Sequence, residues 1–113
     1  MTSILIVGNS GLIGKATENH FLKSGIYKEV FGIDFGDDFD LKNRNSIQAF
    51  LQKNRDINYI INASGLNDHV SNSKLRTDQF QTDLANMDEF LALNVKSVCW
   101  LIEDARNILS DLR

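Results

Sequence analysis

Three glycines stand at positions 8, 11 and 14, in the stretch VGNSGLIGKA, between an apolar run and a segment with helical periodicity. Glycine loses more conformational entropy on folding than any other residue, so three glycines in seven positions indicate a constraint on the backbone. A loop from a strand into a helix presents the N–H groups of the helix N-terminus, where the helix dipole is positive and binds anions. The spacing therefore predicts a loop that binds a diphosphate rather than a merely tight turn.

Each glycine has its own expected role. Gly8 permits the tight turn, Gly11 lets the backbone approach the ligand without an intervening Cβ, and Gly14 lets the helix pack closely on the strand. The residues expected to surround the diphosphate are Gly8, Asn9, Ser10, Gly11, Leu12, Ile13 and Gly14.

The spacing also argues against other nucleotide-binding loops. A P-loop, GxxxxGK[ST], needs glycine at position 9 and a hydroxyl at position 16, but these positions hold Asn9 and Ala16. The hydroxyl that would bind magnesium at a triphosphate site is therefore missing. The GxGxxG pattern fails because position 10 is a serine.

The elements that must position this loop begin with three apolar segments of strand length, at residues 3–7, 29–34 and 58–63. They alternate with helical segments, which predicts a parallel α/β sheet of three main strands with the first strand in the middle. Residues 37–41 follow the second strand too closely for the crossover that a parallel neighbour needs. They are expected to form a loop or a short fourth strand.

Helical periodicity predicts three helices. The first ends at Ser24-Gly25 and buries the face formed by Ile13, Ala16, Thr17, His20 and Phe21. The second is capped by Asn45 or Ser46 and buries Ile47, Phe50 and Leu51. The third begins at Leu84 or at a capping box of Asn86 and Glu89, and its buried stripe comprises Leu84, Met87, Leu91, Val95, Val98, Ile102, Ala105 and Leu109.

Two features of the C-terminal part bear on partners and substrate. Phe90, Leu93 and Trp100 lie outside the predicted stripe, and they are expected to meet a second copy of the chain or a further domain. This makes the 84–110 helix the candidate surface for a homo-oligomer. The polar stretch 64–83 has no sustained periodicity, and a connection of that length is usually functional or disordered. It is expected to lie near the substrate.

Composition restricts the classes of partner. The chain has 113 residues and a net charge of −3, and its Lys and Arg are scattered, so a nucleic-acid surface is not expected. No apolar stretch is long enough to span a bilayer, and the start MTSILIVG lacks the regions of a signal peptide. One cysteine, Cys99, permits no internal disulfide, which favours the cytoplasm; it is expected to be a small apolar residue in a helix.

The stretch GNSGLIG resembles the GxxGxxG cofactor loop of the extended branch of the short-chain dehydrogenase/reductase superfamily, which comprises NAD-dependent epimerases, dehydratases and sugar-nucleotide reductases. The other main branch uses GxxxGxG, which Leu12 breaks, and Val7 stands where the family often has Thr. The resemblance implies a Rossmann-like, three-layer α/β/α fold. Residues 1–113 are then expected to form the N-terminal NAD(P)-binding portion of such a domain, truncated before its catalytic region.

Two acidic positions extend the resemblance. Asp34 lies twenty residues after Gly14 and matches the acidic residue that binds the adenosine ribose; a carboxylate there repels a 2′-phosphate, so NAD is expected in preference to NADP. Phe35, which follows Asp34, is also expected to contact the cofactor. Asp40-Leu41 resembles the Asp-apolar pair that lines the adenine.

Two later stretches also match. Asn62, Ala63, Ser64 and Gly65 resemble the family's small-residue motif, which lets the backbone lie against the ribose and nicotinamide. Residues 93–109 resemble the family's long helix. The resemblance implies that its asparagine, here Asn94, is a catalytic residue, because in many members of the family this residue bends the helix and holds an active-site water.

The catalytic Tyr-x-x-x-Lys pair of the family is missing. Tyr27 is followed four residues later by Phe31, and Tyr59 by Ala63. His20 is expected to be packed and His69 solvated, and no metal site is predicted. The resemblance implies the NAD-binding portion of an oxidoreductase or epimerase/dehydratase acting on a sugar nucleotide or another small alcohol or carbonyl. The alternatives are a non-catalytic dinucleotide-binding or interaction module, and a relative that keeps the fold but binds nothing.

Overall fold

The computed structural model describes residues 2–34, 39–65, 88 and 91–113. Its elements, in chain order, are β1 (Ser3–Val7), α1 (Leu12–Ser24), β2 (Glu29–Ile33), α2 (Arg44–Lys53), β3 (Tyr59–Asn62), the π-helix η2 (Ala92–Lys96) and α6 (Ser97–Ile108).

The three strands form one parallel sheet in the order β2-β1-β3, which confirms the predicted topology. β1 is buried along its whole length, as its unbroken apolar run predicts. Val7 at its end pairs with Ile33 of β2 and Asn62 of β3. The residues that follow all three strands therefore meet at one edge of the sheet, its carboxyl edge.

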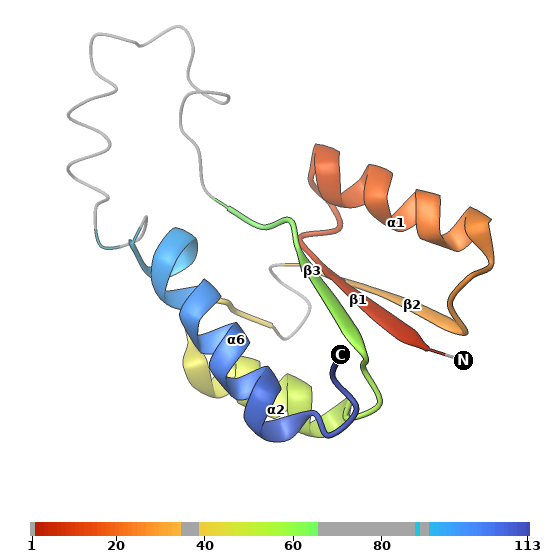
Figure 1. The fold of residues 1–113 in the computed structure, drawn as a ribbon. Coiled ribbons are helices and arrows are strands. Elements are labelled where there is room, and N and C mark those ends of the chain that lie inside the picture. Colours follow the sequence, from red (N-terminus) through yellow and green to blue (C-terminus); the bar gives the residue numbers. More distant parts are fainter. Residues whose placement is uncertain (1, 35–38, 66–87, 89–90) are drawn as a thin grey trace, which may run out of the picture.

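The helices cover the two faces of this sheet. Figure 1 shows α1 on one face, and α2 with α6 on the other. The main core lies on the second face, where Leu5 and Val7 contact α2 and α6 through Ile47, Leu51 and Leu101. Three layers therefore form, as predicted.

The predicted inner face of α1 is wrong in part. Thr17 and Phe21 are half-buried, but Ile13 is 72% exposed, and Ala16 and His20 are exposed as well. The buried residue of the helix is Gly14. The close packing of Gly14 on the loop before the helix fixes which side faces the sheet, and this side lies about one residue away from the apolar stripe.

The predicted stripe of the last helix is also wrong in part. Leu101, Ala105 and Leu109 are buried, and Leu93 and Trp100, which were expected to face outward, pack against the core. Leu91, Val95, Val98 and Ile102 are exposed instead. The buried side includes the polar residues Ser97 and Asp104, which concealed it from a search for apolar periodicity. The predicted helix start and Phe90 lie outside the described residues.

The segment before α2 corrects two further expectations. The N-cap is Asn43, whose side chain accepts a hydrogen bond from the Asn45 N–H at 3.0 Å, rather than Asn45 or Ser46. The Ser46 hydroxyl instead accepts from the Asp40 N–H at 2.8 Å. Residues 39–41 form no strand, and residues 37 and 38 lie outside the described part.

Asp104 connects α6 to α2. It is only 3% exposed, and its carboxylate accepts hydrogen bonds from Arg44 at 2.9 and 3.2 Å and from Gln48 at 3.2 Å. The hydrogen bond to Asp104 is the main reason why the pKa of Arg44 is raised, so the guanidinium stays charged. This bidentate pair holds the two helices in one register.

We expect Asp104→Ala to lower the Tm of the chain by about 5 °C or more, because the substitution removes the buried charged acceptor that joins Arg44 and Gln48 of α2 to α6. Thermal unfolding followed by circular dichroism measures this change. Glu103→Ala is the matched control: this carboxylate also contacts Arg44, at 3.2 Å, but its side chain is 62% exposed. An equal effect of the two substitutions would contradict a special role of the buried carboxylate.

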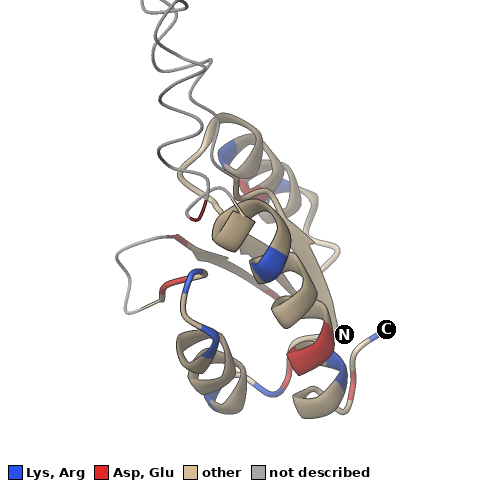
Figure 2. Ribbon diagram, turned by 90° about the vertical axis from the view of Figure 1, so that its left-hand side faces the viewer, with Lys and Arg blue, Asp and Glu red and all other residues tan. Residues whose placement is uncertain are grey.

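Charged side chains are spread over the described surface. Figure 2 shows Lys and Arg on α1, α2 and α6 rather than gathered on one element. In the described part of the chain, no helix combines the length and the apolar character needed to cross a bilayer. The single cysteine, Cys99, lies in a helix as expected, but it is exposed.

Candidate cofactor-binding site

A cavity of about 360 Å³ opens at the carboxyl edge of the sheet. This is the position at which open parallel α/β sheets bind ligands, and its volume lies within the ~300–1,000 Å³ usual for small-molecule sites. It is lined by Val7, Gly8, Ser10, Gly11, Asp34, Phe39, Leu41, Lys42, Ala63, Ser64, Gly65 and Leu93.

Gly8 begins the loop that forms one wall of the cavity. Its φ is +85°, a conformation that favours glycine. A Cβ at this position would lie 2.8 Å from the Ser64 nitrogen, so the glycine also lets the ends of β1 and β3 approach each other. Its N–H donates to the Ile33 carbonyl at 2.8 Å, which holds the loop against the end of β2.

Gly14 and Gly11 differ in their surroundings. A Cβ on Gly14 would lie 1.9 Å from the Gly8 carbonyl oxygen, so the first turn of α1 rests directly on the loop backbone. A Cβ on Gly11 would meet only that same oxygen, at 3.6 Å, an ordinary contact. Gly14 therefore permits helix packing, whereas Gly11 leaves space on the cavity side.

The N-terminus of α1 is suited to an anion. Its N-cap is Gly11, which has no side chain to occupy the N–H groups of the first turn. α2 shows the contrast, since its N-cap Asn43 accepts a hydrogen bond from Asn45. Because Gly11 also lines the cavity, the N-terminal N–H groups and the positive end of the dipole are available to a ligand there.

Asp34 lies on the rim of the cavity, directly after β2. Its Oδ2 accepts a hydrogen bond from the Ser10 N–H at 3.1 Å. The carboxylate therefore lies next to the glycine loop, where it can accept hydrogen bonds from ribose hydroxyls and disfavour a second negative charge.

Asp40 and Leu41 have different surroundings. Leu41 is buried and lines the cavity. The Asp40 carboxylate accepts from the Lys42 N–H at 2.9 Å, an Asx turn that leads into α2. Lys42, which follows this pair, also lines the cavity and places a cationic residue in its wall. Its position in the sequence, directly after the expected adenine contacts, would have identified it.

The stretch after β3 forms the opposite wall. Ala63, Ser64 and Gly65 line the cavity, and the Asn62 side chain accepts from the Ser64 N–H at 3.1 Å. A Cβ on Gly65 would lie 3.4 Å from Asn94 Oδ1, so η2 approaches this wall. η2 is a short π-helical segment that continues into α6, and such π-bulges occur frequently at functional sites.

Not every predicted contact lines the cavity. Those that do not are Asn9, Leu12, Ile13, Gly14, Asp40, Asn62 and Asn94. Phe35, His69 and the rest of the stretch to residue 83 lie outside the described residues. Lining residues that the sequence search missed are Val7, Phe39, Lys42 and Leu93.

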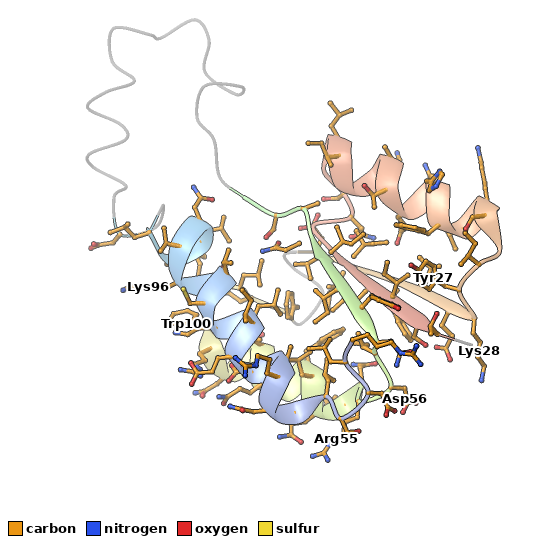
Figure 3. The ribbon with its side chains drawn as sticks, in the orientation of Figure 1. Tyr27, Lys28, Arg55, Asp56, Lys96 and Trp100 are labelled. Atoms are coloured by element: carbon orange, nitrogen blue, oxygen red, sulfur yellow. The ribbon has the colours of Figure 1, made fainter. Side chains whose placement is uncertain are left out.

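The two tyrosines lie at the other end of the sheet. Tyr59 begins β3, and its ring centroid is 5.9 Å from that of Tyr27. Tyr27 precedes β2 and lies at the end of the sheet where that strand begins (Figure 3). Both are therefore at the amino edge, away from the cavity. Among the described residues, no three His, Cys, Asp or Glu side chains form a group that could hold a metal ion.

Relatives share this architecture. The chain is 28% identical over 90 residues to GDP-L-fucose synthase from Dictyostelium discoideum, an alignment that covers 80% of this chain and 28% of that protein. The solved structure of DdhaC superposes with a TM-score of 0.65 and 25% identity, over 94% of this chain and 27% of that one. The protein lin1944 from Listeria innocua, 18% identical, shares the fold with a TM-score of 0.66 over 98% of this chain and 52% of that one.

The chain thus spans about a quarter of the first two proteins. The sequence pattern of the NAD dependent epimerase/dehydratase family matches residues 4–97, from β1 through the glycine loop and the end of β3 to η2. The chain belongs to the NAD dependent epimerase/dehydratase family.

Proposed function

We propose that the cavity binds NAD. The diphosphate lies at the N-terminus of α1, the adenosine ribose bonds to Asp34, and the nicotinamide end lies toward residues 63–65. The observation that carries the proposal is the glycine-capped helix N-terminus that opens on the cavity beside an acidic side chain. A diphosphate would supply the acceptors for the helix N–H groups, and the ribose would supply hydroxyl donors for the carboxylate.

We further propose that the chain is the cofactor-binding portion of an oxidoreductase or epimerase/dehydratase whose substrate is a sugar nucleotide or another small alcohol or carbonyl. The similarity to a protein named GDP-L-fucose synthase supports the sugar-nucleotide class. Asn94 is the proposed active-site residue, since it lies in η2 close to Gly65. The unpaired, exposed Cys99 supports a cytoplasmic location.

Isothermal titration of the 113-residue chain with NAD and with NADP tests the cofactor. We expect saturable binding of both, with NAD the tighter ligand. A folded sample that binds neither dinucleotide would overturn the proposal and favour a relative that keeps the fold alone. NAD binding without catalytic turnover would also be expected of a non-catalytic dinucleotide-binding module. A Tyr-x-x-x-Lys pair encoded downstream of this sequence would argue against such a module.

A self-association surface is the second part of the proposal. Four apolar residues recur at helical spacing from the position before η2 into α6 and are 36–56% exposed; we call them the exposed stripe: Leu91, Val95, Val98 and Ile102. Figure 3 shows the same helical stretch with Lys96, the last residue of η2, and Trp100 of α6 labelled. Apolar residues that recur on one exposed helical face are suited to pack against a second copy of the helix.

We expect Val98→Glu to convert a dimer of this chain into a monomer, because the substitution places a charge in the middle of the exposed stripe. Sedimentation velocity measures the change. Asn107→Glu, at an exposed position of α6 outside the stripe, is the control and is expected to remain dimeric. A wild-type chain that is monomeric at high concentration would contradict self-association.

A further inference from the structure

Asn9 and Glu18 form a side-chain pair between the glycine loop and α1, and neither residue lines the cavity. Asn9 Nδ2 donates to Glu18 Oε2 at 3.2 Å, with Oε1 at 3.5 Å. Asn9 belongs to the loop, but it does not line the cavity. Glu18 belongs to the second turn of α1 and is half-buried against the sheet.

The pair fits against one residue of β2. A Cβ on Gly32 would lie 1.8 Å from Glu18 Oε2 and 2.2 Å from Asn9 Nδ2. Gly32 has no positive φ, so its backbone does not require glycine. A strand with a glycine in its interior is weakened, yet here the missing side chain provides the space that the pair occupies.

This pair adds to the connections that hold the loop. The N–H groups of Gly8 and Asn9 donate to the Ile33 carbonyl at 2.8 and 3.5 Å, and the N–H of Ser10 donates to Asp34, so three hydrogen bonds run to the end of β2. The side chain of Asn9, between them, runs to α1. The loop is therefore fixed relative to both the sheet and the helix whose N-terminus faces the cavity.

We infer that Glu18 is a positioning residue for cofactor binding, which acts through Asn9 to hold residues 8–11 in the conformation that receives the diphosphate. The inference rests on the proposed function. It assigns a role to an acidic side chain that does not line the cavity. The physical basis is preorganisation: a loop already ordered in its bound conformation loses less entropy when the ligand binds.

The test compares NAD dissociation constants of wild-type and variant chains by titration. We expect Glu18→Ala to weaken NAD binding roughly tenfold, the equivalent of one hydrogen bond to a charged group. Glu18→Gln retains an acceptor for the Asn9 amide, so it should restore binding to within about threefold of wild type. Asn9→Ala should weaken binding as Glu18→Ala does, and the double variant should be no weaker than either alone.

Gly32→Ala is an independent variant that leaves both partners in place. Its Cβ would displace the ends of the Asn9 and Glu18 side chains, so we expect weaker NAD binding although alanine suits a strand better than glycine. Asn19→Ala, at the adjacent exposed position of α1, is the matched control and should bind NAD as wild type does. Wild-type affinity in both Glu18→Ala and Gly32→Ala would overturn the inference.

Amide hydrogen exchange at Ser10 and Gly11, without ligand, separates this inference from the cofactor proposal. We expect Glu18→Ala to speed exchange at these amides roughly tenfold, while Glu18→Gln does not. Failure of the wild-type chain to bind NAD would overturn the cofactor proposal. Unchanged exchange in Glu18→Ala would overturn the positioning role of Glu18.

Discussion

Gly14→Ala is expected to weaken NAD binding about 100-fold or more and to destabilise the fold. The added Cβ would lie 1.9 Å from the Gly8 carbonyl oxygen, 2.7 Å from the Gly8 carbonyl carbon and 3.1 Å from the Asn9 Cα. These are backbone atoms and cannot rotate away as a side chain can. The first turn of α1 must move off the loop, and overpacking of this kind costs about 1–3 kcal/mol in free energy of unfolding.

The loss in free energy of NAD binding should exceed what the loss in free energy of unfolding alone would suggest. A shift of the helix withdraws several N–H groups from the diphosphate together, and each such charge-assisted bond contributes about 1.5–3 kcal/mol. We therefore expect NAD to bind about 100-fold more weakly or worse. Titration with NAD and urea unfolding monitored by circular dichroism measure the two effects.

Substitutions at two other glycines distinguish the effect on NAD binding from the effect on stability. Gly11→Ala meets only an ordinary contact at 3.6 Å and has a negative φ, so folding should be nearly unchanged while the Cβ intrudes on the diphosphate. Gly25→Ala lies at the opposite end of α1, with φ +67° and no neighbour within 4 Å of its Cβ. It should destabilise the chain by about 1 kcal/mol through backbone strain and leave NAD binding unchanged. Wild-type affinity in Gly14→Ala would contradict the proposed seat of the diphosphate.

The glycine loop was the most predictable part of the molecule because its constraints are local. The positive φ of Gly8 and the contact of Gly14 with the Gly8 carbonyl follow from a chain that must turn from a strand into a helix within a few residues. The strand order was also predictable, since an unbroken apolar run such as residues 4–7 must be buried on both faces, as in a central strand.

The buried faces of α1 and α6 could not be read from periodicity because both helices carry more apolar residues than one face needs. Tertiary contacts decide between the faces: Gly14 orients α1, and the pair of Arg44 with Asp104 orients α6. The face of α6 that packs on the core contains Ser97 and Asp104, whose polar character pointed the other way. The partners of buried polar groups are set by the fold as a whole and are not visible in a one-dimensional pattern.

The candidate site also combines positions that could be predicted with positions that could not. The position of Asp34 beside the glycine loop was predictable from its distance to Gly14 along the chain, because both residues flank the same crossover. The orientation of Asp40 was not, since its carboxylate accepts from the Lys42 N–H in a local turn, and such turns compete with contacts across a cavity. Asp40 is therefore a natural control for Asp34.

Asp34→Asn should change the preference for the cofactor. In the wild-type chain, the carboxylate would face the 2′-phosphate of NADP, and two like charges about 4 Å apart near a surface repel by up to about 4 kcal/mol. Exposure at the cavity rim reduces this, so we expect NAD to bind about 30- to 100-fold more tightly than NADP. The asparagine variant removes the charge, and NADP should gain about tenfold or more.

The asparagine also keeps an oxygen that can accept from the Ser10 N–H, so the loop retains this connection. NAD should lose about tenfold, since its ribose hydroxyls exchange a charged acceptor for a neutral one. Asp34→Ala removes the charge and the acceptor together. Both dinucleotides should therefore bind more weakly to Asp34→Ala than to Asp34→Asn, which separates repulsion from loop positioning.

Ionic strength distinguishes the electrostatic cause from a steric one. Repulsion between the Asp34 carboxylate and the 2′-phosphate is screened by salt, so the preference for NAD should narrow as salt rises from 0.05 M to about 0.5 M. Asp34→Asn should show little of this dependence, and Asp40→Asn, whose carboxylate is bonded within its own turn, should retain the wild-type preference and its salt response. A wild-type chain that binds NADP as tightly as NAD at low salt would contradict the role of Asp34, even with the diphosphate seated on α1 as proposed.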